Sequence, residues 1–148
     1  MTEPTTHETE RLMRLWMADC AARVLPIFEG KNESLAPRKA IIAARQYARG
    51  EIDSHAMEAA SSAAYHDCYN GDSWSCDFAA HAATMVSAEH MTQAVQDVSM
   101  TIADVMASHI VPEREGDEWS EIYNAERQWQ FDRLIMWLSG DEPEVLPL

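Results

Sequence analysis

The sequence has no lysine and no arginine from Gly50 to Glu113. The same stretch carries ten carboxylates, and much of the rest of it is alanine, serine, methionine and valine. Small apolar residues suit closely packed helices, and the carboxylates suit an acidic outer face without cations. The net charge of the whole chain is −14, which disfavours direct binding to nucleic acid or to an anionic membrane, because both repel it.

Other features are also missing. The chain has only five glycines, no glycine-rich phosphate loop and no alternation of the kind that strands show. No apolar run approaches the roughly 20 residues of a membrane helix. The first ten residues are polar and acidic, MTEPTTHETE, so they do not read as a signal peptide. We therefore expect a cytoplasmic protein.

The three cysteines are odd in number and share no metal-type spacing. Reduced and mostly buried thiols are expected. A site made of His66, Cys68, Cys76 and His81 could close across a helical hairpin, but zinc needs four converging ligands and this spacing is not a zinc pattern. No Glu-x-x-His pair of a di-metal bundle occurs, and nothing marks a cysteine as an activated nucleophile. We predict no catalytic residue, no metal and no cofactor.

Charge is unevenly distributed along the chain. Residues 1–50 hold eight Lys and Arg against six Asp and Glu, whereas residues 51–148 hold three against nineteen. This asymmetry indicates a basic partner, or a protein that imitates nucleic acid. The alternative is that the acidity serves solubility alone.

Helical periodicity and stop signals predict an all-α, single-domain bundle of about six helices. The bundle should occupy residues 1–140, followed by a flexible tail over 141–148, where two prolines disfavour regular structure. The expected helices cover residues 7–25, 37–49, 55–69, 73–86, 88–109 and 117–139. A tight turn at Asn70-Gly71 should join the third and fourth of them.

Asp19 lies on the apolar side of the first expected helix, four residues before Arg23. A carboxylate within an apolar stripe needs a partner, and Arg23 is placed to be one. We therefore predict a half-buried structural ion pair between them, with a catalytic Asp19 as the minor alternative. Pro26 should kink or end this helix.

The helix expected over residues 88–109 has the clearest amphipathic pattern. One side is apolar, and the other presents carboxylates, amides and Met100. That outer side is either an ordinary solvated face or part of a recognition surface. The surface that we predict to bind a partner consists of Asp67, Asp72, Asp77, Glu89, Asp97 and Asp104.

The last expected helix contains Trp119, Trp129 and Trp137, and its end is apolar nearly all round. Such a helix either wedges between two neighbours or packs on a second subunit. A homodimer through this C-terminal helix is therefore possible.

Four segments of the chain resemble a family of helical immunity proteins from bacteria and phages, the immunity-five-like group. They are LWMADCAARVLP at residues 15–26, PRKAI with AARQYARG at 37–50, AAHAA at 79–83, and ERQWQ with RL at 126–134. The resemblance implies an all-helical, non-enzymatic protein that binds and silences a toxin. It carries over no binding residue, and the chain departs from the group in its acidic second half and its longer 110–125 region.

These observations favour an acidic inhibitor that neutralises a basic protein toxin. The alternative is a phage anti-defence protein, similar to an anti-CRISPR protein, that presents carboxylates where phosphates would sit and so blocks a nucleic-acid-binding effector.

Overall fold

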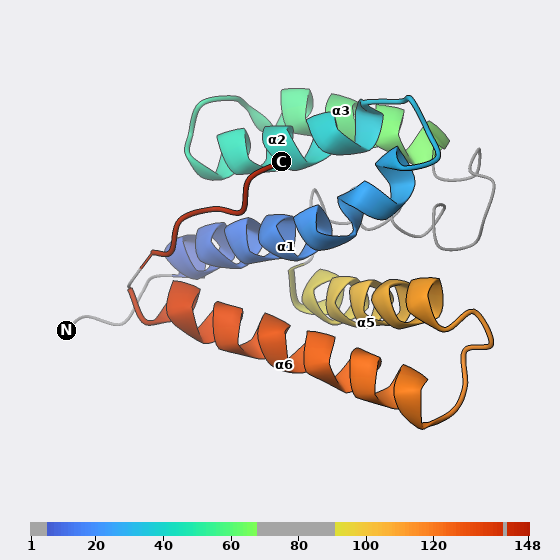
Figure 1. The fold of residues 1–148 in the computed structure, drawn as a ribbon. Coiled ribbons are helices and arrows are strands. Elements are labelled where there is room, and N and C mark those ends of the chain that lie inside the picture. Colours follow the sequence, from blue (N-terminus) through green and yellow to red (C-terminus); the bar gives the residue numbers. More distant parts are fainter. Residues whose placement is uncertain (1–5, 68–90, 141) are drawn as a thin grey trace.

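Helix α1 lies at the centre of the fold, with α2 and α3 on one side of it and α5 and α6 on the other (Figure 1). The computed structural model describes residues 6–67, 91–140 and 142–148. The helices are α1 (Thr6–Glu29), α2 (Ala36–Ala48), α3 (Ser54–Asp67), α5 (Met91–Ile110) and α6 (Asp117–Leu138). No strand occurs in these ranges, so the predicted all-α class is confirmed. The helix expected over 73–86 and the turn at Asn70-Gly71 lie outside the described residues.

The helix starts follow local chemistry. Asp53 caps α3, since its carboxylate accepts a hydrogen bond of 2.9 Å from the Ala56 amide. Pro37 lies in the first turn of α2, where its missing N–H has no intrahelical role. Gly50 follows α2 with a φ of 76°, a conformation that favours glycine after a helix end.

Pro26 lies inside α1 and does not end it. The helix continues to Glu29, although proline removes one backbone donor and crowds the preceding turn. Figure 1 shows α1 changing direction toward its C-terminal end, as expected for a proline kink. Of the two outcomes predicted for Pro26, the structure therefore has the bent helix.

The core forms where α1 meets its neighbours. Trp16, Met17, Val24 and Phe28 of α1 are buried, and Ile41 of α2 packs into the same cluster. Further members come from α1 itself, and the other helices contribute Ala40, Ala44, Met57, Val98, Ile102, Val105 and Trp137, among others. Small alanines in α2 allow α1 and α2 to approach closely.

Asp19 is fully buried, and four donors converge on its carboxylate. Arg45 of α2 lies 3.1 Å from Oδ1, and Arg133 of α6 lies 2.9 Å from Oδ2. The indole of Trp137 donates to Oδ2 at 3.0 Å, and the amide of Leu146 donates to Oδ1 at 3.1 Å. One α1 side chain therefore joins α2, α6 and the C-terminal tail.

The predicted pair between Asp19 and Arg23 is wrong. Arg23 binds Glu126 of α6 instead, with 2.7 Å between Nη2 and Oε2, and its guanidinium lies 3.9 Å from the ring centroid of Trp129. The reason is that both side chains project from α1 toward other helices. Their partners lie on α2 and α6, so the sequence of α1 alone does not reveal them.

Residues 142–148 are extended and lie along the bundle (Figure 1). Glu142 pairs with Arg11, and the carbonyl of Glu144 accepts a hydrogen bond from Arg133. Val145 packs against the core, next to the Leu146 amide that binds Asp19. These contacts place the tail against the bundle, and the flexibility predicted for it stays a prediction.

No helix in the described part of the chain combines the length and the apolar character that crossing a membrane requires.

Candidate protein-binding groove between α5 and α6

Two of the six carboxylates predicted to bind a partner can be located on the surface. Asp97 is exposed on α5, and Asp104 is half-buried on the same helix. Asp67 ends α3, and its side chain is outside the description, as are the whole of Asp72, Asp77 and Glu89. The structure therefore brings Asp97 and Asp104 together and leaves the other four as predictions.

Asp97 and Asp104 line one groove between α5 and α6, with a volume of about 410 Å³. The other lining residues are Met100, Thr101, Trp119 and Tyr123. The four α5 residues have spacings of three, four and seven, so they share one side of the helix. The predicted amphipathic pattern is confirmed there: Val98, Ile102 and Val105 face the core, whereas Gln96, Asp97 and Met100 are exposed.

Met100 is the apolar centre of the α5 side of the groove. Its side chain is 53% exposed, between the two carboxylates along the helix. A flexible, polarisable methionine fits partner surfaces of different shape. An exposed methionine beside carboxylates can therefore add apolar contact to an acidic surface.

The α6 side of the groove is aromatic. Trp119 and Tyr123 stack with 5.1 Å between ring centroids and 19° between ring planes. The Trp119 indole donates to the Ser108 hydroxyl at 3.1 Å, which fixes the ring against α5. Arg127 donates to the Tyr123 hydroxyl at 3.4 Å. Two held aromatic rings lose little conformational entropy when a partner covers them.

Asp104 has a structural role inside the groove. Its carboxylate lies 3.0 Å from Arg114 and accepts a hydrogen bond of 3.0 Å from Ser108. Arg114 belongs to the loop before α6 and has a φ of 57°. The Asp104–Arg114 pair therefore holds this loop to α5, and Asp97 is the more exposed carboxylate of the two.

Negative charge continues beyond the groove. The loop after α5 and the first two turns of α6 carry five exposed carboxylates, Glu113, Glu115, Asp117, Glu118 and Glu121. Asp117 and Glu118 also lie in the first turn of α6, where the helix dipole favours carboxylates. Arg114 is the one cation in this segment, and Asp104 already binds it. The groove thus has a strongly acidic border.

Trp119 and Tyr123 were not among the residues that the sequence predicted to bind a partner. A signal was present, because aromatic residues four apart lie on one side of a helix. Nothing in the sequence, however, showed that this side of α6 would adjoin the acidic side of α5. The pairing of the two helices creates the groove.

Cys20 is the one cysteine among the described residues. Cys20 is buried, and burial raises the pKa of its thiol well above the ordinary value, with Glu126 and Asp19 adding to the effect. The thiol therefore stays protonated and unreactive. In the same part of the chain no three His, Cys, Asp or Glu residues are placed to hold a metal ion. Cys68, Cys76 and His81 lie outside the description, and His66 is exposed on α3.

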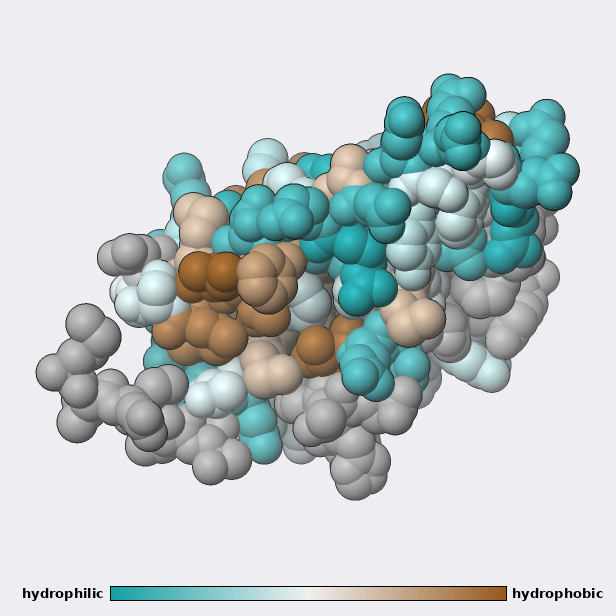
Figure 2. All heavy atoms as spheres, turned by 90° about the horizontal axis from the view of Figure 1, so that it is seen from below, coloured by the Kyte–Doolittle hydropathy of each residue, from teal (hydrophilic) through white to brown (hydrophobic). Residues whose placement is uncertain are grey.

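The C-terminal half of α6 has a different surface. Apolar side chains gather over one end of the face shown in Figure 2, where most of the remainder is hydrophilic. The exposed apolar residues of this half of α6 are Phe131, Ile135, Met136 and Leu138, and we call these four residues the α6 apolar patch. Trp137 is not part of it, because it is buried against Asp19.

A comparison with protein families matches residues 3–136 to the Imm-5 like putative immunity protein family. The chain belongs to this family. The match includes α1 to α6 almost entirely, and therefore both sides of the groove. The resemblance seen in the sequence is confirmed, and the family description names an immunity role, which implies a protein partner. Searches of curated proteins and of solved structures give no match for this Imm-5 like protein.

Proposed function

We propose that this Imm-5 like protein is a non-enzymatic, cytoplasmic inhibitor that binds and neutralises a basic protein toxin through the α5–α6 groove. The observation that carries the proposal is the combination of Asp97 with Met100, Trp119 and Tyr123 in one groove. Carboxylates and anchored apolar groups occur there side by side. Family membership supports a protein partner, and the charge of −14 supports a basic one.

The two kinds of residue have different tasks in this proposal. Asp97 and the five exposed carboxylates near the start of α6 would attract a positive surface and raise the association rate, especially at low salt. Met100, Trp119 and Tyr123 would supply most of the affinity, since aromatic anchors in a closely packed interface usually dominate binding energy. Charge selects the partner, and apolar contact retains it.

The experiment identifies the partner first and then tests the surface. Cross-linking and affinity capture from the source cell provide candidates, and each purified candidate is titrated against the inhibitor by calorimetry. Asp97→Lys is expected to weaken binding and to reduce its salt dependence, because a steering charge is reversed. Tyr123→Ala is expected to weaken binding by about 2 kcal/mol while leaving the salt dependence unchanged.

Glu58→Lys is the matched control. Glu58 is exposed on α3, outside the groove, and the substitution makes the same charge change as Asp97→Lys. The proposal requires that Glu58→Lys bind nearly as well as the unchanged protein. Equal losses from Asp97→Lys and Glu58→Lys would mean that net charge alone controls binding and that the groove is not the contact.

The nucleic-acid-mimic alternative uses the same acidic surface and differs in its target. If the captured partner binds DNA or RNA, that nucleic acid and the inhibitor should exclude one another in a competition titration. A toxin inhibited at another surface would bind both together. Coexpression with the partner then shows whether the inhibitor restores growth.

The α6 apolar patch supports a second contact, the homodimer predicted through the C-terminal helix. Four exposed apolar side chains on one helix end are more than scattered surface residues require. The patch and the groove share no residue, so a dimer would leave the groove accessible.

A further inference from the structure

The bundle holds one of its own arginines with a pair of groups, a carboxylate and an aromatic ring. Glu126 accepts hydrogen bonds of 2.9 and 2.7 Å from Arg23, whose guanidinium also lies 3.9 Å from the ring centroid of Trp129. A guanidinium suits both groups, because its planar fork matches a carboxylate and its face stacks on an aromatic ring. Glu126 and Trp129 are three residues apart on α6, so one side of one helix supplies both groups.

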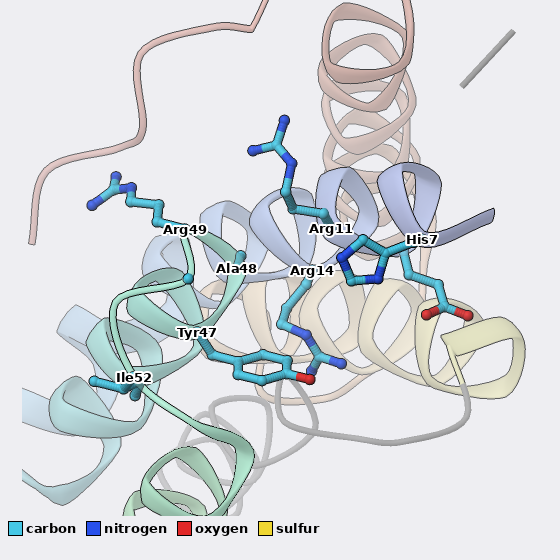
Figure 3. A pocket seen from close by; sticks show the side chains of 9 residues that line it. His7, Arg11, Arg14, Tyr47, Ala48, Arg49 and Ile52 are labelled. Carbon is cyan, nitrogen blue, oxygen red and sulfur yellow. The ribbon is translucent and has the colours of Figure 1, made fainter. Parts of the chain in front are cut away.

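Arg14 gives a second example of a guanidinium beside a ring. It lines a hollow between α1 and α2 and lies 5.2 Å from the ring centroid of Tyr47, and Figure 3 shows these two side chains pointing toward one another. Arg11 and Arg49 line the same hollow, together with one carboxylate, Glu10. Three arginines and one carboxylate are the wrong balance of charge for a positive side chain of a partner.

The α5–α6 groove brings carboxylates and aromatic rings together at the surface. Asp97 and Asp104 come from α5, the stacked rings of Trp119 and Tyr123 come from α6, and all four line one hollow of about 410 Å³. Asp97 is exposed and both rings are half-buried, so a partner can reach them. Asp104 already binds a guanidinium, since Nη2 of Arg114 lies 3.0 Å from its Oδ2 and 3.3 Å from its Oδ1. The groove therefore contains the groups that hold Arg23 inside the bundle.

The contacts that these carboxylates already make do not exclude a further donor. A carboxylate has about four acceptor positions, and the Asp104 side chain is still 29% exposed beside Arg114. Local charge also favours another cation, because Asp97, Asp104 and the five carboxylates of the acidic border outnumber Arg114 and Arg127. A guanidinium from a partner can thus be added to the groove without removing Arg114.

We propose that the α5–α6 groove binds an arginine side chain of the protein partner, with the guanidinium on Asp97 and the stacked Trp119 and Tyr123 rings. The aliphatic part of the arginine lies along Met100. This inference rests on the proposed function and names the group that the partner inserts. Lysine fits less well, because its ammonium is more strongly hydrated and cannot form two parallel hydrogen bonds to one carboxylate. Preference for arginine over lysine therefore distinguishes this site from a surface that is merely acidic.

The test is an NMR titration of the full chain with acetyl-Ala-Arg-Ala-amide and with its lysine and citrulline counterparts. The readout is the indole N–H resonance of Trp119, which is identified by its loss in Trp119→Phe. The arginine peptide is expected to shift this resonance saturably, with a dissociation constant on the order of millimolar or tighter. The lysine peptide should bind about threefold more weakly or worse, and the neutral citrulline peptide should cause no saturable shift.

Matched variants make the test specific to the groove. Asp97→Asn should weaken binding of the arginine peptide about fivefold, the size of effect that one exposed ion pair allows. Glu58→Gln is the control, since it removes the same charge from an exposed site on α3 outside the groove, and it should change binding far less. Tyr123→Leu keeps apolar volume and loses the ring, so it should reduce the preference for arginine over lysine.

The proposal is overturned if no peptide shifts the Trp119 resonance saturably, if lysine or citrulline binds as well as arginine, or if Asp97→Asn and Glu58→Gln weaken binding equally. In that case the proposed function stands alone if the natural partner still responds to Asp97→Lys and Tyr123→Ala and not to Glu58→Lys. Selective binding of the arginine peptide, with a natural partner that is insensitive to those changes, would support the arginine site and contradict the proposed function.

Discussion

The indole N–H of Trp137 donates a hydrogen bond of 3.0 Å to the carboxylate of Asp19, a residue 118 positions away in the chain. Both side chains are buried, and Arg45 and Arg133 bind the same carboxylate. This cluster joins α1, α2 and α6 at one point. It explains why a carboxylate can lie in the centre of a helical core.

Replacing Asp19 with alanine should destabilise the protein by about 3–5 kcal/mol, because the buried Arg45 and the half-buried Arg133 lose their counter-charge. Chemical denaturation followed by tryptophan fluorescence measures the change. Asp132→Ala is the control, since Asp132 is exposed on α6 and binds only a neighbouring amide among the hydrogen bonds described for it. Equal stability of Asp19→Ala and the unchanged protein would mean that the cluster does not form.

The C-terminal tail should be ordered by the same cluster. The Leu146 amide donates to Asp19, so its hydrogen exchange should be slower than that of an unstructured amide. Exchange measured by NMR tests this, and Asp19→Asn should accelerate it by weakening the acceptor. A Leu146 amide that exchanges at the random-coil rate in the unchanged protein would restore the prediction of a flexible tail.

Cys20 should make stability depend on pH in the alkaline range. Its folded pKa is raised by burial, so the unfolded thiol ionises first, and unfolding releases a proton above the ordinary thiol pKa of roughly 8.5. Stability is then fully present below that pKa and falls as pH rises, by at most about 1.4 kcal/mol per pH unit for one proton.

The measurement compares the unfolding free energies of the unchanged protein and of Cys20→Ala from pH 7.5 to about 10, a range set by the thiol pKa. The decline should be shallower in Cys20→Ala. Parallel curves for the two proteins would show that the Cys20 thiol ionises as readily in the folded state as in the unfolded one.

The α6 apolar patch should control self-association. Light scattering after size-exclusion chromatography is expected to show a dimer for the unchanged protein and a monomer for Ile135→Glu, because Ile135 is 50% exposed within the patch. Leu35→Glu is the control, since Leu35 is exposed to a similar degree just before α2. A monomeric unchanged protein at high concentration would exclude the dimer.

The helices were predictable because their signals are local. Asp53 caps α3, and Gly50 and Gly116 lie at helix ends with positive φ, as glycine permits. The amphipathic side of α5 was likewise readable from the spacing of Val98, Ile102 and Val105.

Partners across helices were not predictable. The sequence suggested Arg23 for Asp19 because four residues separate them, yet both find partners on other helices. Arg38 of α2 binds Glu29 of α1, and Arg45 of α2 binds Asp19 of α1, and neither partner follows from residue spacing within one helix. Such choices depend on how the helices pack against one another, and the pattern of a single sequence does not reveal that packing. For the same reason, the aromatic side of the α5–α6 groove was not predictable from the sequence.

The most direct measurement of the central claim is site-specific photocross-linking to the partner. A photoreactive amino acid replaces Met100 in the groove or, as the control, His55, which is exposed on α3. A covalent adduct with the partner is expected from position 100 and none from position 55. An adduct from position 55 with none from position 100 would contradict it.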